Sequence, residues 1–412
     1  MTDLTAADGL PLKTALARAE RRARGRALLL VAPLLAFICL TFVVPIGQLL
    51  YRSVWNPGFS DNMPALEQWF ADNPAGTAPD EAAFAALAAD LAAASKAKTI
   101  GVVGTRINYD MPGTRSLFTS GARKADDLAA PFAESVPAMD RKWADPELWA
   151  VMRAAASAHT PNFYVAAFDR KLDETGAIVR VPPGERVYVP LFWKTMALSA
   201  GIAAICLVVA FPVAHLLATL PLARSNLLMI LVLLPFWTSL LVRTTAWIAI
   251  LQGQGVVNDS LVGLGILSDA NRLQMMYNQT GTIIAMTHIL LPFMILPLYS
   301  VMRTIKPTYV RAARSLGASS WTAFRRVYLP QTLPGIGAGV LLVFILAVGY
   351  YITPALVGGA SGQLFSNMIA FHMQRSLNWS LAAALAAILL GAVLLLYWLY
   401  DRLVGIDNMK LG

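Results

Sequence analysis

The sequence predicts an all-α membrane protein with six transmembrane helices and a large polar segment inserted between the first and second helices. Three observations lead to this fold class. Apolar residues make up 57% of the 412-residue chain and charged residues only 14%, against roughly 25% charged residues in ordinary globular proteins. Six stretches of about 20 mostly apolar residues are each long enough to cross a bilayer. The alternating strands of a membrane β-barrel, roughly ten residues long, are missing, so helices are the expected spanning elements.

The first apolar stretch is interpreted as a retained helix rather than a cleaved signal peptide. Residues 27–51 are all uncharged, which is long enough for a span, and no small-residue cleavage pattern follows them. The fifth span lies inside the uncharged run 327–374, so its ends are placed at Pro334 and at the turn signal Gly358-Gly359. The six spans are expected at residues 27–50, 194–219, 227–251, 281–302, 335–357 and 380–400.

Lysine and arginine are distributed unevenly over the short loops, and this distribution sets the expected orientation. The N-terminal tail to Arg26 holds six basic residues, and the stretch 303–334 holds six more without any acid. The loops 252–279 and 358–379 hold one basic residue each. We therefore expect both termini and the 303–334 loop on the cytoplasmic side of the membrane.

The segment between the first two spans has a different composition. Residues 52–190 carry 17 of the chain's 24 acidic residues, and no run in this segment is long enough to cross a bilayer. Long polar segments are translocated regardless of their charge, so this one is expected on the outer face. Residues 80–95 and 145–158 have the composition of helices. Residues 99–104, Thr-Ile-Gly-Val-Val-Gly, are predicted to form a short strand.

Several functional classes are excluded by what the sequence lacks. Without a G-x4-G-K-S/T stretch the chain has no phosphate-binding loop, so no ATPase activity of its own is expected. No acid lies in the cores of the six spans, which argues against a proton-driven carrier built on intramembrane carboxylates. The net charge of +9 indicates contact with anionic lipid headgroups rather than with nucleic acid, and no nucleic-acid motif is present. Cys39 and Cys206 are interpreted as buried thiols, and no metal or cofactor is expected on this chain.

The 303–334 loop has too regular a pattern for a plain connector. Residues 308–316 have helical spacing, with Ala312, Ala313 and Leu316 on one side. Gly317 is expected to break this helix, and a second helical stretch, 319–328, to stop before Leu329-Pro330. Small residues allow close approach of another protein, and the arginines around them offer charge-assisted contacts.

This stretch resembles the cytoplasmic EAA loop of binding-protein-dependent ABC importer permeases, whose pattern is E-A-A, three residues, Gly, nine residues, an aliphatic residue, one residue and Leu-Pro. The matching residues are Ala312, Ala313, Gly317, Val327 and Leu329-Pro330. In this family the loop is the coupling helix that docks into a groove on the ATPase subunit. The resemblance therefore implies an ATPase-coupling site made of Arg311, Ala312, Ala313, Arg314, Ser315, Gly317, Ala318, Leu329 and Pro330.

Two positions depart from the family pattern. Arg311 stands where the family has glutamate, and Ser315 stands at a commonly acidic position. The local charge is thereby reversed, and a matching change on the ATPase is the hypothesis that follows.

Longer stretches resemble the spermidine/putrescine-type branch of the same family. Residues 234–259, 294–302 and 333–360 carry this resemblance, which covers roughly 190–405 and the first span but not most of 60–185. It implies the following organisation: a cytoplasmic tail at 1–26, the first span at 27–50, a periplasmic insertion at 51–192, a permease core at 193–405 with the coupling loop at 303–334, and a C-terminal tail at 406–412.

Polar and aromatic residues of the third and fifth spans are candidates for the translocation pathway. They are Trp237, Arg243, Thr244, Trp247, Tyr350 and Tyr351. An arginine at mid-bilayer costs about 2.5–3.5 kcal/mol on insertion scales, so Arg243 either faces the bundle interior or snorkels to the headgroups. The aromatic rings either bind a cationic substrate through cation–π contacts or form interfacial belts. His215 and His288 are expected to be hydrogen-bonded to neighbouring helices rather than to act as proton relays.

The resemblance implies a multi-pass permease of the bacterial inner membrane that imports a small solute. Polyamines such as putrescine and spermidine are the leading class, with opines, phosphonates, thiamine or ferric iron as alternatives. The implied partners are an ATPase dimer that carries ATP and Mg²⁺, a second permease subunit or a copy of this one, a periplasmic solute-binding protein and membrane lipids. Two other classes stay open. One is an ion-coupled secondary transporter, although no inverted repeat is seen; the other is a membrane-anchored binding module built on 52–190.

Overall fold

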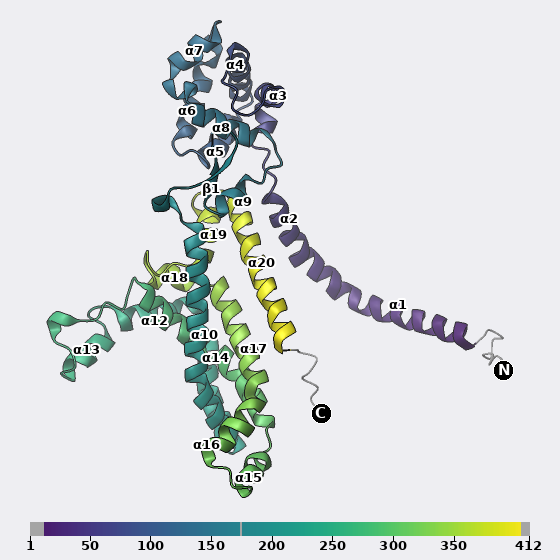
Figure 1. Ribbon diagram of the computed structural model, residues 1–412, viewed down its shortest axis with the longest axis vertical. Helices are drawn as coiled ribbons and strands as arrows, with labels where there is room; N and C mark the ends of the chain where they lie inside the picture. Colours follow the sequence, from purple (N-terminus) through teal and green to yellow (C-terminus); the bar gives the residue numbers. More distant parts are fainter. Residues whose placement is uncertain (1–11, 174, 405–412) are drawn as a thin grey trace.

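The computed structural model describes residues 12–173 and 175–404, and almost all of its regular structure is helical (Figure 1). Within these ranges six helices are long and apolar enough to cross a membrane, which confirms the predicted fold class. Part of the predicted N-terminal tail, residues 1–11, and the predicted C-terminal tail, 406–412, lie outside the described residues.

The chain divides into a bundle of long helices and an inserted domain, residues 53–187. The long helices and their neighbours are α1 (Leu12–Ile38), α2 (Val44–Arg52), α10 (Tyr188–Thr219), α11 (Leu222–Leu233), α12 (Leu240–Leu251), α13 (Val256–Gly263), α14 (Gln279–Thr304), α15 (Pro307–Ser315), α16 (Ser320–Ala323), α17 (Leu329–Gly349), α18 (Ile352–Val357), α19 (Phe365–Gln374) and α20 (Trp379–Val404). The inserted domain holds α3 (Pro64–Asp72), α4 (Glu81–Lys96), α5 (Ile100–Asn108), α6 (Thr114–Lys124), α7 (Phe132–Met139), α8 (Pro146–Ala156), α9 (Asn162–Ala167), β1 (Arg170–Leu172) and β2 (Ile178–Arg180). Two π-helical turns are η1 (Cys39–Val43) and η8 (Phe324–Tyr328), and η6 (Leu234–Trp237) is a 3₁₀ turn.

Buried apolar side chains of α10, α14 and α17 form the core of the bundle. Cys206 on α10, Met294 on α14 and Val343 on α17 are all fully buried in one cluster. Gly339 on α17 faces Met294, where a Cβ would lie 2.7 Å from the Met294 Sδ atom. The glycine therefore lets α17 approach α14 closely, as small residues do between membrane helices.

Four of the six predicted spans are continuous helical runs. The first lies within the run Glu20–Arg52, the second in α10, the fourth in α14 and the sixth in α20. In the first run α1 projects away from the bundle and none of its apolar window is buried, whereas α2 lies against α20 (Figure 1). This helix therefore leaves its apolar surface to lipid or to another subunit.

The third predicted span, 227–251, is wrong as a single helix. The chain forms α11, turns at η6 and starts again as α12. Pro235 lies in the turn, where its ring and missing N–H interrupt the helical ladder. Ser239 then caps α12, because its side-chain oxygen accepts a hydrogen bond from the Val242 N–H at 3.2 Å.

The fifth predicted span is displaced at both ends. Its helix begins at Ser320, passes through the π turn η8 and runs on to Gly349, so the expected stop before Leu329-Pro330 is wrong. Pro330 is tolerated because it lies in the first turn of α17, directly after the π turn. At the other end the helix stops at Gly349 rather than at 357, and α18 is a separate short helix.

The inserted domain is a helical unit with its own apolar core. Fully buried side chains include Phe59, Leu87, Phe118 and Trp143. The helices predicted at 80–95 and 145–158 are confirmed as α4 and α8, and Asp80 caps α4 through the Ala83 N–H at 2.9 Å.

The strand predicted at 99–104 is wrong, because these residues begin α5. Gly104 lies where α5 packs on α6. A Cβ at this position would lie 3.2 Å from the Phe118 Cβ on α6. Close packing of α5 on α6 therefore overrides the β propensity of Val102 and Val103.

The inserted domain joins the end of the bundle opposite the 303–334 loop (Figure 1). Asp169 accepts hydrogen bonds from the N–H groups of Val187, Tyr188 and Val189 and so caps the start of α10. A second link runs from the Tyr109 hydroxyl to the Leu377 carbonyl, at 2.8 Å, beside the start of α20. The domain is thus fastened to two of the long helices.

Candidate functional site

The 303–334 loop is a helix that ends in a tight left-handed turn. α15 stops at Ser315, and Gly317 has φ +90°, a conformation that favours glycine. The Ala318 N–H donates to the Ala313 carbonyl at 3.1 Å, and the Gly317 N–H donates to the Arg314 carbonyl at 3.0 Å. These two bonds make a Schellman motif, so the predicted break at Gly317 is confirmed as a defined turn.

The tip of this loop exposes large apolar side chains. Leu316 is 89% exposed, Trp321 67% and Tyr309 50%. Helical spacing places Leu316 on one side with Ala312 and Ala313, but α15 ends one residue earlier and the turn directs Leu316 outward. An exposed leucine and tryptophan in a basic loop are the usual anchors of a protein contact.

The loop is strongly basic. Its exposed basic side chains are Arg303, Lys306, Arg311, Arg314, Arg325 and Arg326. No acid occurs between residues 303 and 334, and none of these side chains joins an ion pair found among the described residues. The loop therefore presents uncompensated positive charge around its apolar tip.

Two hydrogen-bonded contacts fasten the loop to the bundle. The Tyr328 hydroxyl lies 2.9 Å from Nδ1 of His215 on α10. The Arg303 guanidinium donates to the Ala218 and Leu220 carbonyls, at 2.8 and 3.2 Å, at the end of α10. The loop is therefore joined to α10 as well as to α14 and α17.

Four of the six candidate pathway residues lie on α12 or directly after α17: Arg243, Thr244, Trp247 and Tyr350. Trp247 on α12 donates from Nε1 to Nδ1 of His288 at 3.1 Å. Thr244 is buried, and its hydroxyl donates to the Leu240 carbonyl. The Nε atom of Arg243 is buried and has no hydrogen-bond partner among the described residues.

The other two candidates are exposed. Trp237 is 73% exposed in the turn η6, and Tyr351 is partly exposed between α17 and α18. Both histidines of the spans, His215 and His288, are hydrogen-bonded to a side chain of another helix, as expected from the sequence. His288, which was not among the pathway candidates, contacts one of them, Trp247.

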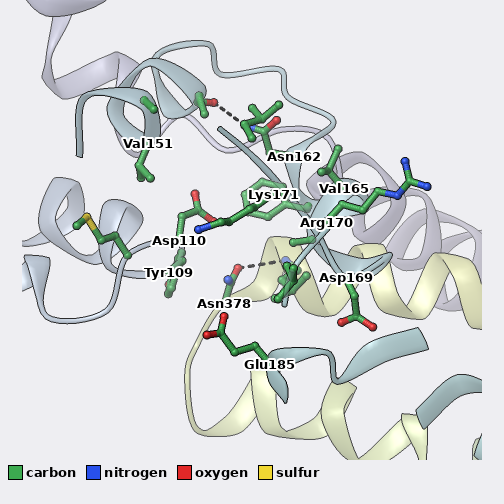
Figure 2. Close-up of a pocket in the computed structure, with 18 of the residues that line it drawn as sticks. Tyr109, Asp110, Val151, Asn162, Val165, Asp169, Arg170, Lys171, Glu185 and Asn378 are labelled. Carbon is green, nitrogen blue, oxygen red and sulfur yellow. Dashed lines mark hydrogen bonds between the residues drawn. The ribbon is translucent and has the colours of Figure 1, made fainter. Parts of the chain in front are cut away.

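A cavity of about 470 Å³ lies between the inserted domain and the adjoining ends of α10 and α20 (Figure 2). Two acidic side chains of its wall form ion pairs: Asp110 with Arg106 at 2.6 Å and Glu147 with Lys171 at 3.1 Å. Asp169, also at its wall, caps α10. The cavity therefore lies at the junction of two parts of the fold, and Asp169 of its wall links them.

Comparison with known proteins places these features in a family. A model described as "Binding-protein-dependent transport system inner membrane component" matches residues 177–405. The spermidine/putrescine transport system permease protein PotB of Escherichia coli (strain K12) is 37% identical over 227 residues, which are 53% of this chain and 82% of that protein. PotB of Haemophilus influenzae is 36% identical over 224 residues, or 54% of this chain and 78% of that protein.

Among solved structures, a chain of a bacterial alginate ABC transporter in complex with an alginate pentasaccharide-bound periplasmic protein has 16% sequence identity and a TM-score of 0.45. The similarity covers 55% of this chain and 80% of that chain. The family match carries the assignment, since it includes every helix from α10 to α20 and the 303–334 loop. This chain belongs to the binding-protein-dependent transport system inner membrane components, as a multi-pass permease subunit of an ABC importer.

Proposed function

We propose that this permease imports polyamines such as putrescine and spermidine. The observation that carries the proposal is the relationship to the PotB proteins, which are named as spermidine/putrescine permeases and align over 78% to 82% of their own lengths. As a member of its family the chain works with an ATPase and a solute-binding protein. Opines, phosphonates, thiamine and ferric iron are the alternative solutes.

The 303–334 loop is the proposed contact with the ATPase dimer, whose subunits would bind ATP and Mg²⁺. Leu316 and Trp321 provide exposed apolar anchors, and Arg311 and Arg314 flank them with positive charge. Protein interfaces commonly combine such a central apolar contact with a polar rim. The coupling-site residues implied by the family pattern lie in α15, in the turn at Gly317 and at the start of α17.

Movement of the loop would reach the membrane because the loop and the fifth span share one helix. Residues Ser320–Gly349 are helical without a break. The Tyr328–His215 contact adds α10 to this unit. ATP-driven displacement of the loop is therefore expected to move α10, α14 and α17 together, around a pathway completed by a second permease subunit.

We place the loop and both termini in the cytoplasm and the inserted domain in the periplasm. The six basic residues of 303–334 and the absence of acids there support this orientation. The inserted domain lies at the other end of the bundle (Figure 1), so it would meet the periplasm and the solute-binding protein.

The test is uptake of labelled putrescine and spermidine by cells with and without this gene. A strain whose ATPase partner is catalytically dead serves as the control. Uptake that requires both the gene and an active ATPase supports the proposal. ATPase-dependent uptake of another solute would overturn the substrate class alone, whereas uptake driven by an ion gradient without the ATPase would overturn the coupling.

A further inference from the structure

The end of the first span and the start of the sixth meet at one level of the molecule. Residues 27–51 are uncharged, and Arg52 is the first charged residue after them. The sixth span begins at Trp379. α2 packs on α20 where both helices reach the inserted domain (Figure 1). The two helix ends therefore lie where apolar chain gives way to polar chain, which is the level of the lipid headgroups.

A small pocket of about 220 Å³ lies at this place and is called here the α2–α20 pocket. Its lining residues are Arg52, Trp55, Asn56, Pro57, Tyr109, Leu377, Trp379 and Ser380. Pockets that enclose a whole small-molecule ligand usually measure about 300–1,000 Å³. The size of the α2–α20 pocket therefore suits one polar group of a larger molecule.

Hydrogen bonds between distant parts of the chain hold the polar wall of this pocket in place. The Asn56 N–H donates to the Ala158 carbonyl at 2.8 Å, and its side-chain Nδ2 donates to the Ser380 hydroxyl at 3.1 Å. The Tyr109 hydroxyl donates to the Leu377 carbonyl at 2.8 Å. The wall is thus formed before any ligand binds, which lowers the cost of binding.

Two tryptophans of the wall and the apolar surface on the membrane side of the pocket suit a lipid. The Trp55 ring is stacked on Tyr51, with centroids 5.4 Å apart, and Trp379 is partly exposed. Tryptophan is enriched at the headgroup level, because its ring is apolar and its N–H is polar. Further into the span, Ile46 and Leu50 of α2 are both exposed. Acyl chains would therefore find apolar surface next to the pocket.

Arg52 gives the α2–α20 pocket its charge. Among the described residues that line the pocket it is the one charged side chain, so the wall carries one positive charge and no acid. A guanidinium binds phosphate through paired N–H donors. A wall of this charge fits a headgroup with a net negative charge. The ammonium of a zwitterionic headgroup would find no carboxylate there.

We propose that the α2–α20 pocket binds the phosphate of an anionic phospholipid. Arg52 pairs with the phosphate, Trp55 and Trp379 lie beside the glycerol region, and the acyl chains extend over α2 toward α1. The lipid thereby joins the first span, the sixth span and the inserted domain. This role goes beyond transport itself, since it does not depend on which solute the importer carries.

The experiment uses the intact importer complex, reconstituted in bilayers of phosphatidylethanolamine and phosphatidylglycerol and then extracted in mild detergent. Mass spectrometry measures the lipids that stay bound. Wild type is expected to retain phosphatidylglycerol in preference to phosphatidylethanolamine. R52Q is expected to retain at least several-fold less phosphatidylglycerol, and R52K, which keeps the charge, more than R52Q. R375Q is the matched control, because Arg375 is an exposed arginine after α19 that does not line the pocket.

A second arm needs no variant and so stands even if R52Q does not fold. Wild-type complex is stripped of lipid in detergent, and its melting temperature is measured after addition of phosphatidylglycerol, phosphatidylethanolamine or inorganic phosphate. Phosphatidylglycerol alone is expected to raise the melting temperature, because a ligand that binds only the folded state stabilises it. Where R52Q does fold, its melting temperature should not respond.

Four outcomes would overturn the proposal. Equal lipid retention by wild type and R52Q removes the role of Arg52. Equal stabilisation by phosphatidylethanolamine removes the preference for an anionic headgroup. Stabilisation by inorganic phosphate to the same extent makes the pocket a site for a free anion rather than for a lipid. Absence of bound lipid from the intact complex means that another subunit covers the pocket.

Discussion

The Tyr328 hydroxyl lies 2.9 Å from Nδ1 of His215, and this contact joins the base of the 303–334 loop to α10. The two rings also meet edge to face, with centroids 5.0 Å apart. Tyr328 stacks in turn on Phe324, which stacks on Trp321 at the loop. A line of aromatic rings thus runs from the exposed tip of the loop to the second span.

Removal of this hydroxyl is expected to loosen the loop without unfolding the bundle. The variant Y328F keeps the ring stacking and loses one hydrogen bond, a cost of about 1 kcal/mol. We expect a small decrease in melting temperature and a larger decrease in solute transported per ATP hydrolysed. Both are measured in reconstituted complex, with Y309F on the exposed loop as the control. Unchanged coupling in Y328F would show that the contact is only structural.

Leu316 is expected to contribute to assembly rather than to folding. Its side chain is 89% exposed, so L316A removes almost no buried surface from this chain. The melting temperature of the isolated permease should not change, while recovery of the ATPase in affinity purification should fall several-fold. A variant of equal size change at a lipid-facing position, L394A, is the control. A lower melting temperature with full ATPase recovery is the contrary result.

Arg311 is expected to act through its charge. If the ATPase groove carries acids that match the reversed charge of this loop, R311E introduces repulsion and R311K preserves attraction. ATP-driven uptake should therefore fall at least several-fold in R311E and change little in R311K. Uptake by R311E equal to that of wild type would count against a place for Arg311 in the groove.

The proposed orientation is testable with single cysteines. In a chain whose two native cysteines are replaced, S315C reports on the loop and S116C on the inserted domain, and both residues are exposed. An impermeant thiol reagent added to spheroplasts should label S116C alone, and S315C should react only after the membrane is opened. The reverse labelling would place the inserted domain in the cytoplasm.

His372 on α19 is expected to make the fold sensitive to acid. Burial lowers the pKa of His372 to about 4 from the ordinary 6.5. A base with a lowered pKa in the folded state stabilises the fold above pH 6.5, and this contribution is lost as the pH falls toward 4, because the unfolded chain takes up the proton first. The loss amounts to about 3 kcal/mol over the full range.

The measurement compares the melting temperatures of wild type and H372Q at pH 7 and at pH 4.5. The wild-type protein should lose more stability on acidification than H372Q does. Because the Nε2 and Nδ1 atoms contact Tyr188 and Ser376, H372Q also removes hydrogen bonds at both pH values. Only the difference between the two pH values is therefore diagnostic, and parallel curves would contradict the assignment.

The fourth and sixth spans were predictable to within a few residues because charge or polarity marks their ends. The third was not, since both helices around Pro235 are apolar and a hydropathy window does not register a break between them. Likewise the fifth span begins earlier than Pro334 suggested. A proline disrupts only the backbone hydrogen bonds of its own helical turn. The π turn before Pro330 accommodates this disruption, so the helix continues through it.

At the candidate site the sequence predicts where the helix breaks but not which side chains are exposed. The break at Gly317 follows from the sequence alone, because a left-handed turn favours glycine. The outward position of Leu316 depends on the residue at which α15 ends, which helical spacing does not specify. The contact of His288 with Trp247 depends on the packing of α12 on α14, a tertiary contact without a local signal. The roles of the coupling and pathway residues stay predictions.

The π turn at Phe324–Tyr328 sets the direction in which the loop faces. A π turn holds one residue more than an α-helical turn, and each residue of an α-helix rotates the chain by about 100°. Deleting one residue there would straighten the helix, turn the loop by roughly a quarter of a circle and draw it closer to the membrane by about 1.5 Å. Tyr328 would then no longer meet His215, and the loop would point past its partner. A single extra residue thus sets the direction in which the loop, the proposed contact with the ATPase, faces.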